Sequence, residues 1–238
     1  MSHRFADKIA LVTGGTGGLG RAVTLAFLHE GASVIASYIK KDEADALRDA
    51  IGPHAHLELL PLDATDESAC RALVDGITAR YGRLDILVNT IGGYAAGKPA
   101  WETESKIVEL MLTLNFRAGY NMVRASVPAM LRRKSGAIVN IAAKAAFDHA
   151  AGASAYAASK SASLALFDCL AQDLKGTGVR VNSVLPSIID TEPNRKAMPD
   201  ADFSKWPKPE EIAEVILFLC SDSARVVHGA AIPVYGES

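Results

Sequence analysis

The stretch KIALVTGGTGGLGRAVTLAFLHEG, residues 8–31, decides the fold. Residues 8–14 form a short apolar run that ends at a glycine, which is typical of a buried strand. Residues 19–31 show helical periodicity and stop at Gly31. A strand, a glycine-rich turn and a helix in this order predict the start of a βαβ unit.

The rest of the chain repeats this alternation. Further strands are predicted at 32–37, 56–63, 84–89, 136–141, 179–185 and 230–235, and further helices at 42–51, 67–82, 156–176 and 209–222. Residues 105–133 are predicted to form one or two helices. Continuously apolar strands that alternate with helices indicate a parallel sheet, covered on both faces and joined by right-handed crossovers. We therefore expect residues 1–238 to form a single α/β domain, a doubly wound Rossmann fold.

Composition excludes several classes of protein. Hydrophobic residues make up 49% of the 238 residues, and the net charge of −2 favours neither nucleic acid nor an anionic membrane as partner. No apolar run is long enough to span a bilayer, and the polar start MSHRFADK is unlike a signal peptide. Three scattered cysteines fit reduced thiols in the cytoplasm, and no residue pattern predicts a metal site.

The segment TGGTGGLG, residues 13–20, is the first candidate site. Its glycines allow a tight turn and let the backbone approach a pyrophosphate, which the following helix N-terminus favours. In a strand–turn–helix context this pattern predicts dinucleotide binding. The residues expected at the turn are Thr13, Gly14, Gly18, Leu19 and Gly20.

The end of the second strand bears on which dinucleotide binds. The position where an acid would meet the ribose hydroxyls of NAD is Tyr38, and Lys40 and Lys41 follow. These lysines are suited to a 2′-phosphate, although solvated loop charges are a common alternative. The sequence therefore favours NADP(H) over NAD(H).

A long irregular stretch, residues 186–209, contains five prolines. Loops of this length in a compact domain are usually functional, and Met198, Phe203 and Trp206 give this one apolar surface to bury. We interpret it as a lid, the alternative being a mobile surface excursion.

Tyr156 and Lys160 lie four residues apart in a helical segment, so their side chains share one helix face. An unperturbed tyrosine has a pKa near 10, and a neighbouring ammonium lowers it, which makes the phenol an effective proton donor and acceptor.

With these residues the chain resembles the short-chain dehydrogenase/reductase family over nearly its whole length. The resemblance implies hydride transfer with Tyr156, Lys160 and Asn115 as catalytic residues. Besides Tyr38, Lys40 and Lys41 at the end of the second strand, the expected cofactor contacts are the glycine turn and Asp63, Ala64, Asn89, Lys160, Pro186, Ile188 and Thr191. Within the family's patterns, Thr90 and Ile91 depart from the Asn-Asn-Ala-Gly element, and Ser187 replaces a glycine.

Ala143 is the main departure, because the family places a serine there to donate a hydrogen bond to the substrate carbonyl. One branch, quinonoid dihydropteridine reductase, lacks this serine, and residues 91–98, 143–148 and 184–206 resemble it. This resemblance implies a flat conjugated substrate near Ala143 with Trp206 of the lid closing over it. The alternatives are a general carbonyl or 3-oxoacyl reductase, with Ser154 a poorly placed substitute donor, and a dinucleotide-sensing protein without catalysis.

Family resemblance also implies a homodimer or homotetramer. The predicted helices at 105–133 and 156–176 carry small and apolar faces, which would pair across a two-fold axis or serve equally as core.

Overall fold

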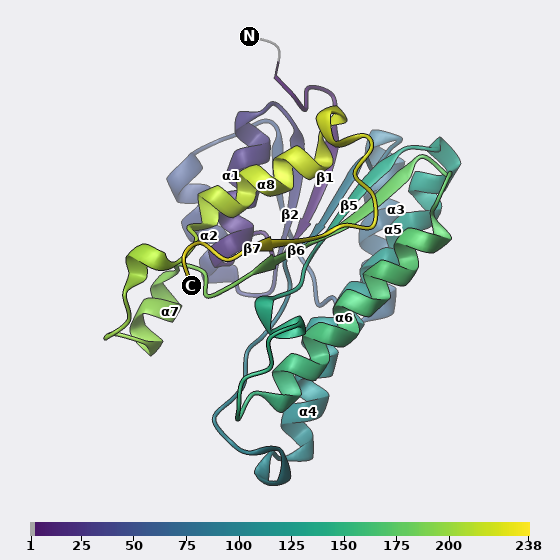
Figure 1. Cartoon of the computed structure of the whole chain (residues 1–238). Helices are drawn as coiled ribbons and strands as arrows, with labels where there is room; N and C mark the ends of the chain where they lie inside the picture. The colour runs from purple at the N-terminus through teal and green to yellow at the C-terminus, as the bar shows by residue number, and fades with distance from the viewer. Residues whose placement is uncertain (1–2) are drawn as a thin grey trace.

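The computed structural model describes residues 3–238, which fold around one seven-stranded parallel sheet (Figure 1). The strand order is β3-β2-β1-β4-β5-β6-β7. The strands are β1 (Ile9–Thr13), β2 (Ser33–Tyr38), β3 (Leu57–Pro61), β4 (Ile86–Asn89), β5 (Gly136–Ile141), β6 (Val179–Pro186) and β7 (Ala231–Val234). The helices are α1 (Gly18–His29), α2 (Lys41–Ile51), α3 (Glu67–Tyr81), α4 (Ser105–Leu112), α5 (Ala118–Arg133), α6 (Ser154–Asp173), α7 (Glu192–Ala197) and α8 (Pro209–Cys220).

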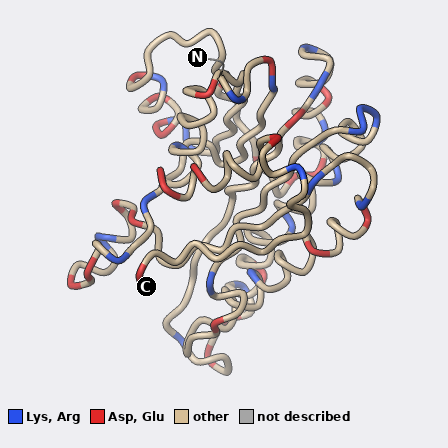
Figure 2. Tube along the Cα trace, turned by 45° about the horizontal axis from the view of Figure 1, so that its top comes forward, with Lys and Arg blue, Asp and Glu red and all other residues tan. Residues whose placement is uncertain are grey.

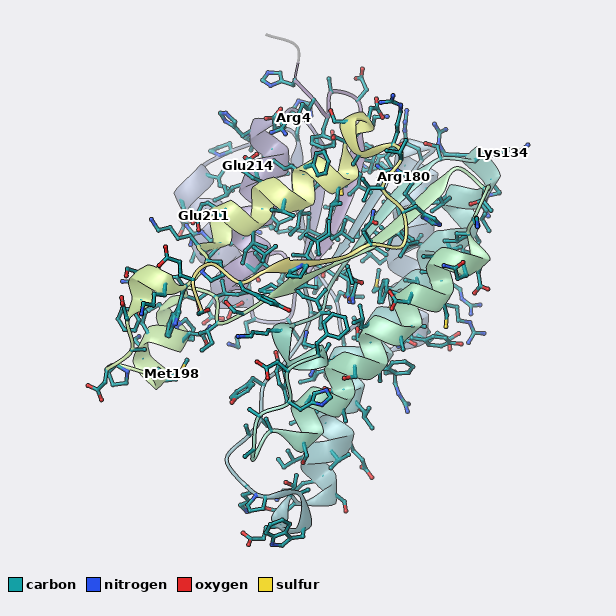
Figure 3. All side chains as sticks on the ribbon, viewed as in Figure 1. Arg4, Lys134, Arg180, Met198, Glu211 and Glu214 are labelled. Carbon is teal, nitrogen blue, oxygen red and sulfur yellow. The ribbon has the colours of Figure 1, made fainter. Side chains whose placement is uncertain are left out.

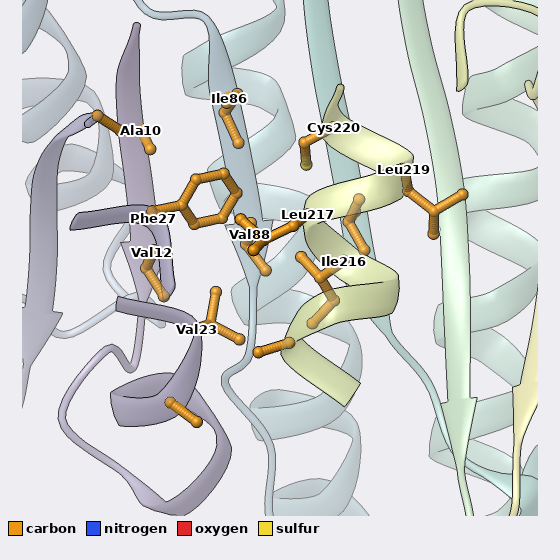
Figure 4. Close-up of a cluster of buried hydrophobic side chains, with 14 of the residues drawn as sticks. Ala10, Val12, Val23, Phe27, Ile86, Val88, Ile216, Leu217, Leu219 and Cys220 are labelled. Carbon is orange, nitrogen blue, oxygen red and sulfur yellow. The ribbon is translucent and has the colours of Figure 1, made fainter. Parts of the chain in front are cut away.

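Helices cover both faces of the sheet, as predicted. One core cluster joins α1 and α8 to the sheet through side chains such as Phe27, Val88 and Ile216 (Figure 4). The other joins α3, α5 and α6 to the opposite face through side chains such as Met122 and Phe167. Burial on both faces explains why the strands read as continuous apolar runs.

Strand register brings the predicted site segments together. Thr13 pairs with Asn89, and Asn89 pairs with Asn140, so β1, β4 and β5 end at the same edge of the sheet. The glycine turn, the segment after Asn89 and the segment containing Ala143 all leave from this edge. In doubly wound sheets this carboxyl edge is where ligands bind.

One connection departs from the prediction of uniformly right-handed crossovers. Successive strands from β4 to β7 step in one direction across the sheet, but α8 lies on the face opposite to α5 and α6. The β6–α8–β7 crossover therefore has the opposite hand to β5–α6–β6. The long segment after β6 lets the chain change faces, and α8 packs along α1 (Figure 1).

The stretch 105–133, predicted as one or two helices, forms α4 and α5, which are joined by a π-helical turn at Thr113–Arg117. The predicted lid contains α7 and a 3₁₀ turn at Phe203–Lys205. It projects from the body, with Met198 far out along the projection (Figures 1 and 3).

Charged residues of both signs are interspersed along the trace (Figure 2). Arg4 illustrates their use, because its guanidinium meets Glu30 and Glu214 and ties the N-terminal segment to α1 and α8 (Figure 3). Within residues 3–238, no helix is both long and apolar enough to cross a membrane.

Candidate active site

The glycine turn borders a cavity of about 330 Å³ at the carboxyl edge of the sheet. Gly14 has a φ of +67°, which favours glycine, and a methyl group on Gly20 would collide with the Gly14 carbonyl. The turn is therefore tight, and it leaves backbone exposed at the start of α1. The predicted residues that line the cavity are Gly14, Gly18, Leu19, Gly20, Tyr38, Asp63 and Ala64. The shape and the helix N-terminus fit a dinucleotide.

The charged lining of this cavity differs from the prediction. Glu43 of α2 lines it, and its Oε2 accepts a hydrogen bond from Thr16 Oγ1 at 3.3 Å. Lys40 Nζ lies 3.0 Å from Glu43 Oε1, and Lys41 pairs with Asp45. Among the described residues, neither lysine belongs to the cavity lining.

Two of the predicted cofactor residues, Asn89 and Asp63, make internal hydrogen bonds through their side chains. Asn89 is buried: its Oδ1 accepts from Thr13 Oγ1 at 3.1 Å, and its Nδ2 donates to Asn140 Oδ1 at 3.1 Å. These two hydrogen bonds link the ends of β1, β4 and β5. Asp63 Oδ1 accepts from the backbone and hydroxyl of Thr65, which shapes the loop that borders the cavity.

Tyr156 and Lys160 lie on α6 at the same edge. Lys160 is buried, its Nζ donates to the Ile141 carbonyl at 3.0 Å, and burial lowers its pKa to about 8. Burial, with a smaller contribution from Tyr94, raises the pKa of Tyr156 to about 12. The expected lowering of the tyrosine pKa is therefore absent, because desolvation of the phenol is the largest effect on it.

Asn115 occupies the π-helical turn and is held by several hydrogen bonds. Its Oδ1 accepts from Gly93 N at 2.9 Å, and its Nδ2 donates to Gly93 O at 3.0 Å and to Ser159 Oγ at 2.9 Å. Ser159 Oγ in turn donates to the Tyr156 carbonyl at 2.7 Å. One buried amide thus connects the loop after β4 to the helical turn that carries Tyr156. Such π-turns are frequent at functional sites.

Gly92 connects the two parts of the site. It lines the dinucleotide cavity, and a methyl group on it would lie 3.1 Å from Lys160 Nζ and 2.8 Å from Asn115 Oδ1. The cavity therefore runs up to the Tyr156–Lys160 side of the molecule.

Ala143 follows β5 and is only 7% exposed, so the position presents a buried methyl group. Tyr94, on the loop after β4, meets Tyr156 edge to face, with ring centroids 4.9 Å apart and an interplanar angle of 75°. Ser154 is the first residue of α6, two residues before Tyr156. Two helical residues correspond to a rotation of about 200°, so Ser154 points away from Tyr156.

The predicted lid meets the glycine turn at its base and packs on itself further out. A methyl group on Gly18 would lie 2.9 Å from Thr191 Cγ2. Pro186 is buried at the end of β6, and Ile188 is exposed. Trp206 is 6% exposed and packs on Phe203, so its ring is not presented to a ligand in this conformation.

Comparison with known proteins decides the family. The sequence profile of short chain dehydrogenases matches residues 8–202. The chain belongs to this family. The 3-oxoacyl-[acyl-carrier-protein] reductase FabG of Thermotoga maritima is 32% identical, with 98% of each chain covered. The D-threitol dehydrogenase of Mycolicibacterium smegmatis is 34% identical, covering 98% of this chain and 93% of the relative.

Solved structures agree with this assignment. A short-chain type dehydrogenase/reductase from Mycobacterium ulcerans superposes with a TM-score of 0.92 at 29% identity, over 98% of this chain and 90% of that one. ElxO with NADP bound gives 0.90 at 25% identity, over 96% and 97%. The protein is therefore an NAD(P)H-dependent reductase of the short-chain dehydrogenase family.

Sequence reasoning about this short-chain dehydrogenase missed Thr16, Glu43 and Tyr94. Glu43 lies in α2, beyond the strand end where an acid is usually sought, and only the fold brings it to the glycine turn. Tyr94 lies within residues 91–98, but nothing in a single sequence shows that this loop folds onto α6.

Proposed function

We propose that the protein uses NAD(P)H to reduce a flat, conjugated C=N or C=O bond, and that a quinonoid dihydropterin is the first substrate to test. The observation that carries this proposal is the buried methyl group of Ala143 at the position of the family's serine. Loss of a polarising donor typically costs about 10²–10³ in rate. An electron-poor conjugated acceptor accepts hydride readily and depends less on that donor.

Tyr156 is suited to protonate the substrate. The phenol is protonated at neutral pH, as a donor to the substrate heteroatom must be, although burial raises its pKa to about 12 and makes it a weaker acid than an ordinary tyrosine. The bound dinucleotide supplies the hydride. Lys160 Nζ, held on the Ile141 carbonyl beside Gly92, would donate to the ribose of a bound cofactor. Asn115 holds the geometry around Tyr156, and its role in holding a water stays a prediction.

A second candidate is a general carbonyl or 3-oxoacyl reductase. The full-length similarity to a 3-oxoacyl-[acyl-carrier-protein] reductase and to a polyol dehydrogenase favours it. A dinucleotide sensor without catalysis is disfavoured, because binding alone would not require Tyr156 and Asn115 beside Lys160.

The preference for NADP(H) that Lys40 and Lys41 predict is untested. The contacts of Glu43 in the structure favour NAD(H) instead. A carboxylate, Glu43, lines the cavity, and Lys40 is paired with it. A carboxylate accepts hydrogen bonds from ribose hydroxyls and repels a 2′-phosphate. We infer that NAD(H) is the better ligand.

Two further expectations stay predictions. The segment 186–209 is a lid whose base, Thr191, lies against Gly18, so that closure would act on the bound dinucleotide. Exposed apolar side chains on α4 and α5, namely Leu110, Leu112, Tyr120 and Leu131, are consistent with a homodimer or homotetramer.

The test is oxidation of NADH and NADPH by the native protein and by Tyr156→Phe, with quinonoid dihydropterin and a panel of ketones as acceptors. We expect Tyr156→Phe to lose at least about 10²-fold in turnover while dinucleotide binding, measured by calorimetry, is unchanged. A native protein that binds dinucleotide but reduces no acceptor would instead indicate a sensor.

A further inference from the structure

The backbone on the N-terminal side of Tyr94 is hydrogen-bonded to Asn115 of the reaction site. The preceding residue, Gly93, has both backbone groups bonded to the Asn115 amide, at 2.9 and 3.0 Å. A methyl group on Gly93 would lie 2.8 Å from Leu114 Cδ1, so the backbone is closely packed there. The same Asn115 amide donates to Ser159, which donates to the Tyr156 carbonyl. One hydrogen-bonded network therefore joins the backbone next to Tyr94 to the helical turn that carries Tyr156.

The two phenols are also neighbours. Their ring centroids are 4.9 Å apart, and Tyr94 adds, after burial, to the rise in the pKa of Tyr156. Tyr94 is 72% exposed beside Tyr156, and solvent or a ligand can reach its side chain.

Three polar side chains on the segments around Tyr156, those of Ser159, Ser161 and Lys144, have partners of their own. Ser159 Oγ is buried and donates to the Tyr156 carbonyl, and Ser161 Oγ donates to the Ala146 carbonyl. Lys144 Nζ lies 5.4 Å from the centre of the Tyr235 ring and 3.6 Å from Asp148 Oδ2. Ser154 points to another side of α6.

We propose that Tyr94 is the second hydroxyl donor of the reaction site and replaces the serine that Ala143 lacks; this inference rests on the proposed function. The hydride supplied by the bound dinucleotide forms the new C–H bond, and the π electron pair of the acceptor moves to its heteroatom. The heteroatom takes the proton of Tyr156, which is restored from solvent. Tyr94 keeps its proton and donates a hydrogen bond to the heteroatom as its charge grows.

The test compares Tyr94→Phe with native protein, Tyr156→Phe and the double variant Tyr94→Phe/Ala143→Ser, on quinonoid dihydropterin and on ketones. We expect Tyr94→Phe to lower kcat about tenfold on the pterin and about 10²-fold on ketones, which depend more on the donor. The added serine should restore at least half of the loss on a logarithmic scale. The matched control is Tyr120→Phe. Tyr120 is also a partly exposed tyrosine, but it lies on α5, and the kcat of this variant should stay within about twofold of native.

The outcomes separate this inference from the proposed function. If Tyr94→Phe stays within twofold of native on every acceptor while Tyr156→Phe fails, the role of Tyr94 is refuted and the proposed function stands. If the native protein reduces ketones but not the pterin, the pterin assignment falls, and the loss on ketones still decides the role of Tyr94. If native protein reduces nothing, both fall together. Melting temperatures of all variants show whether the fold is retained.

Discussion

At the scale of single residues, burial moves the pKa values of Tyr156 and Lys160 in opposite directions. The pKa of the Tyr156 phenol rises to about 12, and the pKa of the Lys160 ammonium falls to about 8. The lysine is therefore partly neutral in mildly alkaline solution, and the tyrosine keeps its proton throughout the physiological range. Tyr156 therefore holds a proton at neutral pH, but its raised pKa makes it a weaker acid than an ordinary phenol.

Lys160 predicts a pH dependence of stability. Its pKa in the folded protein, about 8, lies below the ordinary 10.5, so the unfolded chain binds more protons between these values. The burial cost of the charge is therefore fully present below pH 8 and disappears as pH rises toward 10.5. Without cofactor, the free energy of unfolding of native protein relative to Lys160→Met should rise between pH 7.5 and 10, by an amount on the order of 2 kcal/mol.

Denaturant titrations at both pH values measure this difference. The exposed Lys175→Met is the control, and its difference from native protein should not vary with pH. An equal pH response of native protein and Lys160→Met would mean that Lys160 is charged throughout.

Glu43 predicts the choice of dinucleotide. Its carboxylate faces the cavity beside Thr16, so Glu43→Gln should remove repulsion of a 2′-phosphate. We expect calorimetry to show about tenfold tighter binding of 2′,5′-ADP and weaker binding of 5′-AMP in this variant. Asp45→Asn, on the same helix and paired with Lys41, should change neither by more than about twofold. Native protein that already prefers 2′,5′-ADP would restore the prediction drawn from the lysines.

At the scale of elements, the π-helical turn between α4 and α5 organises the site. An uninterrupted helix would have a different rotation at Asn115, whose amide here reaches both Gly93 and Ser159. The sequence predicts one or two helices across 105–133, but it gives no signal for the π-turn that joins them.

Asn115→Ala should therefore lower turnover more than stability alone explains. We expect a loss of about 2 kcal/mol in the free energy of unfolding, from buried groups left without partners, and about 10²-fold in kcat. Asn182→Ala is the matched control. It removes a buried asparagine bonded to Val227 O and Ala230 N, and should cost similar stability while turnover stays within about twofold. Equal losses of kcat in the two variants would assign Asn115 a purely structural role.

At the scale of the whole molecule, the sequence predicts the sheet well, since apolar strands buried on both faces and a glycine turn leave clear local patterns. Features that depend on tertiary packing were predicted less well. The hand of the α8 crossover follows from packing against α1, and the burial of Trp206 follows from contact with Phe203. Glu43 and Tyr94 reach the site from loops and helices whose course only the fold defines.

The most direct test of the central claim is the rate of NADH and NADPH oxidation by purified protein with quinonoid dihydropterin, beside a panel of simple ketones. Substrate specificity of the whole molecule should follow from the missing serine, so we predict faster turnover of the pterin than of any ketone. Good turnover of ketones together with none of the pterin would contradict the account. Position 143 would then be a substitution that a carbonyl reductase tolerates, and not a mark of the substrate class.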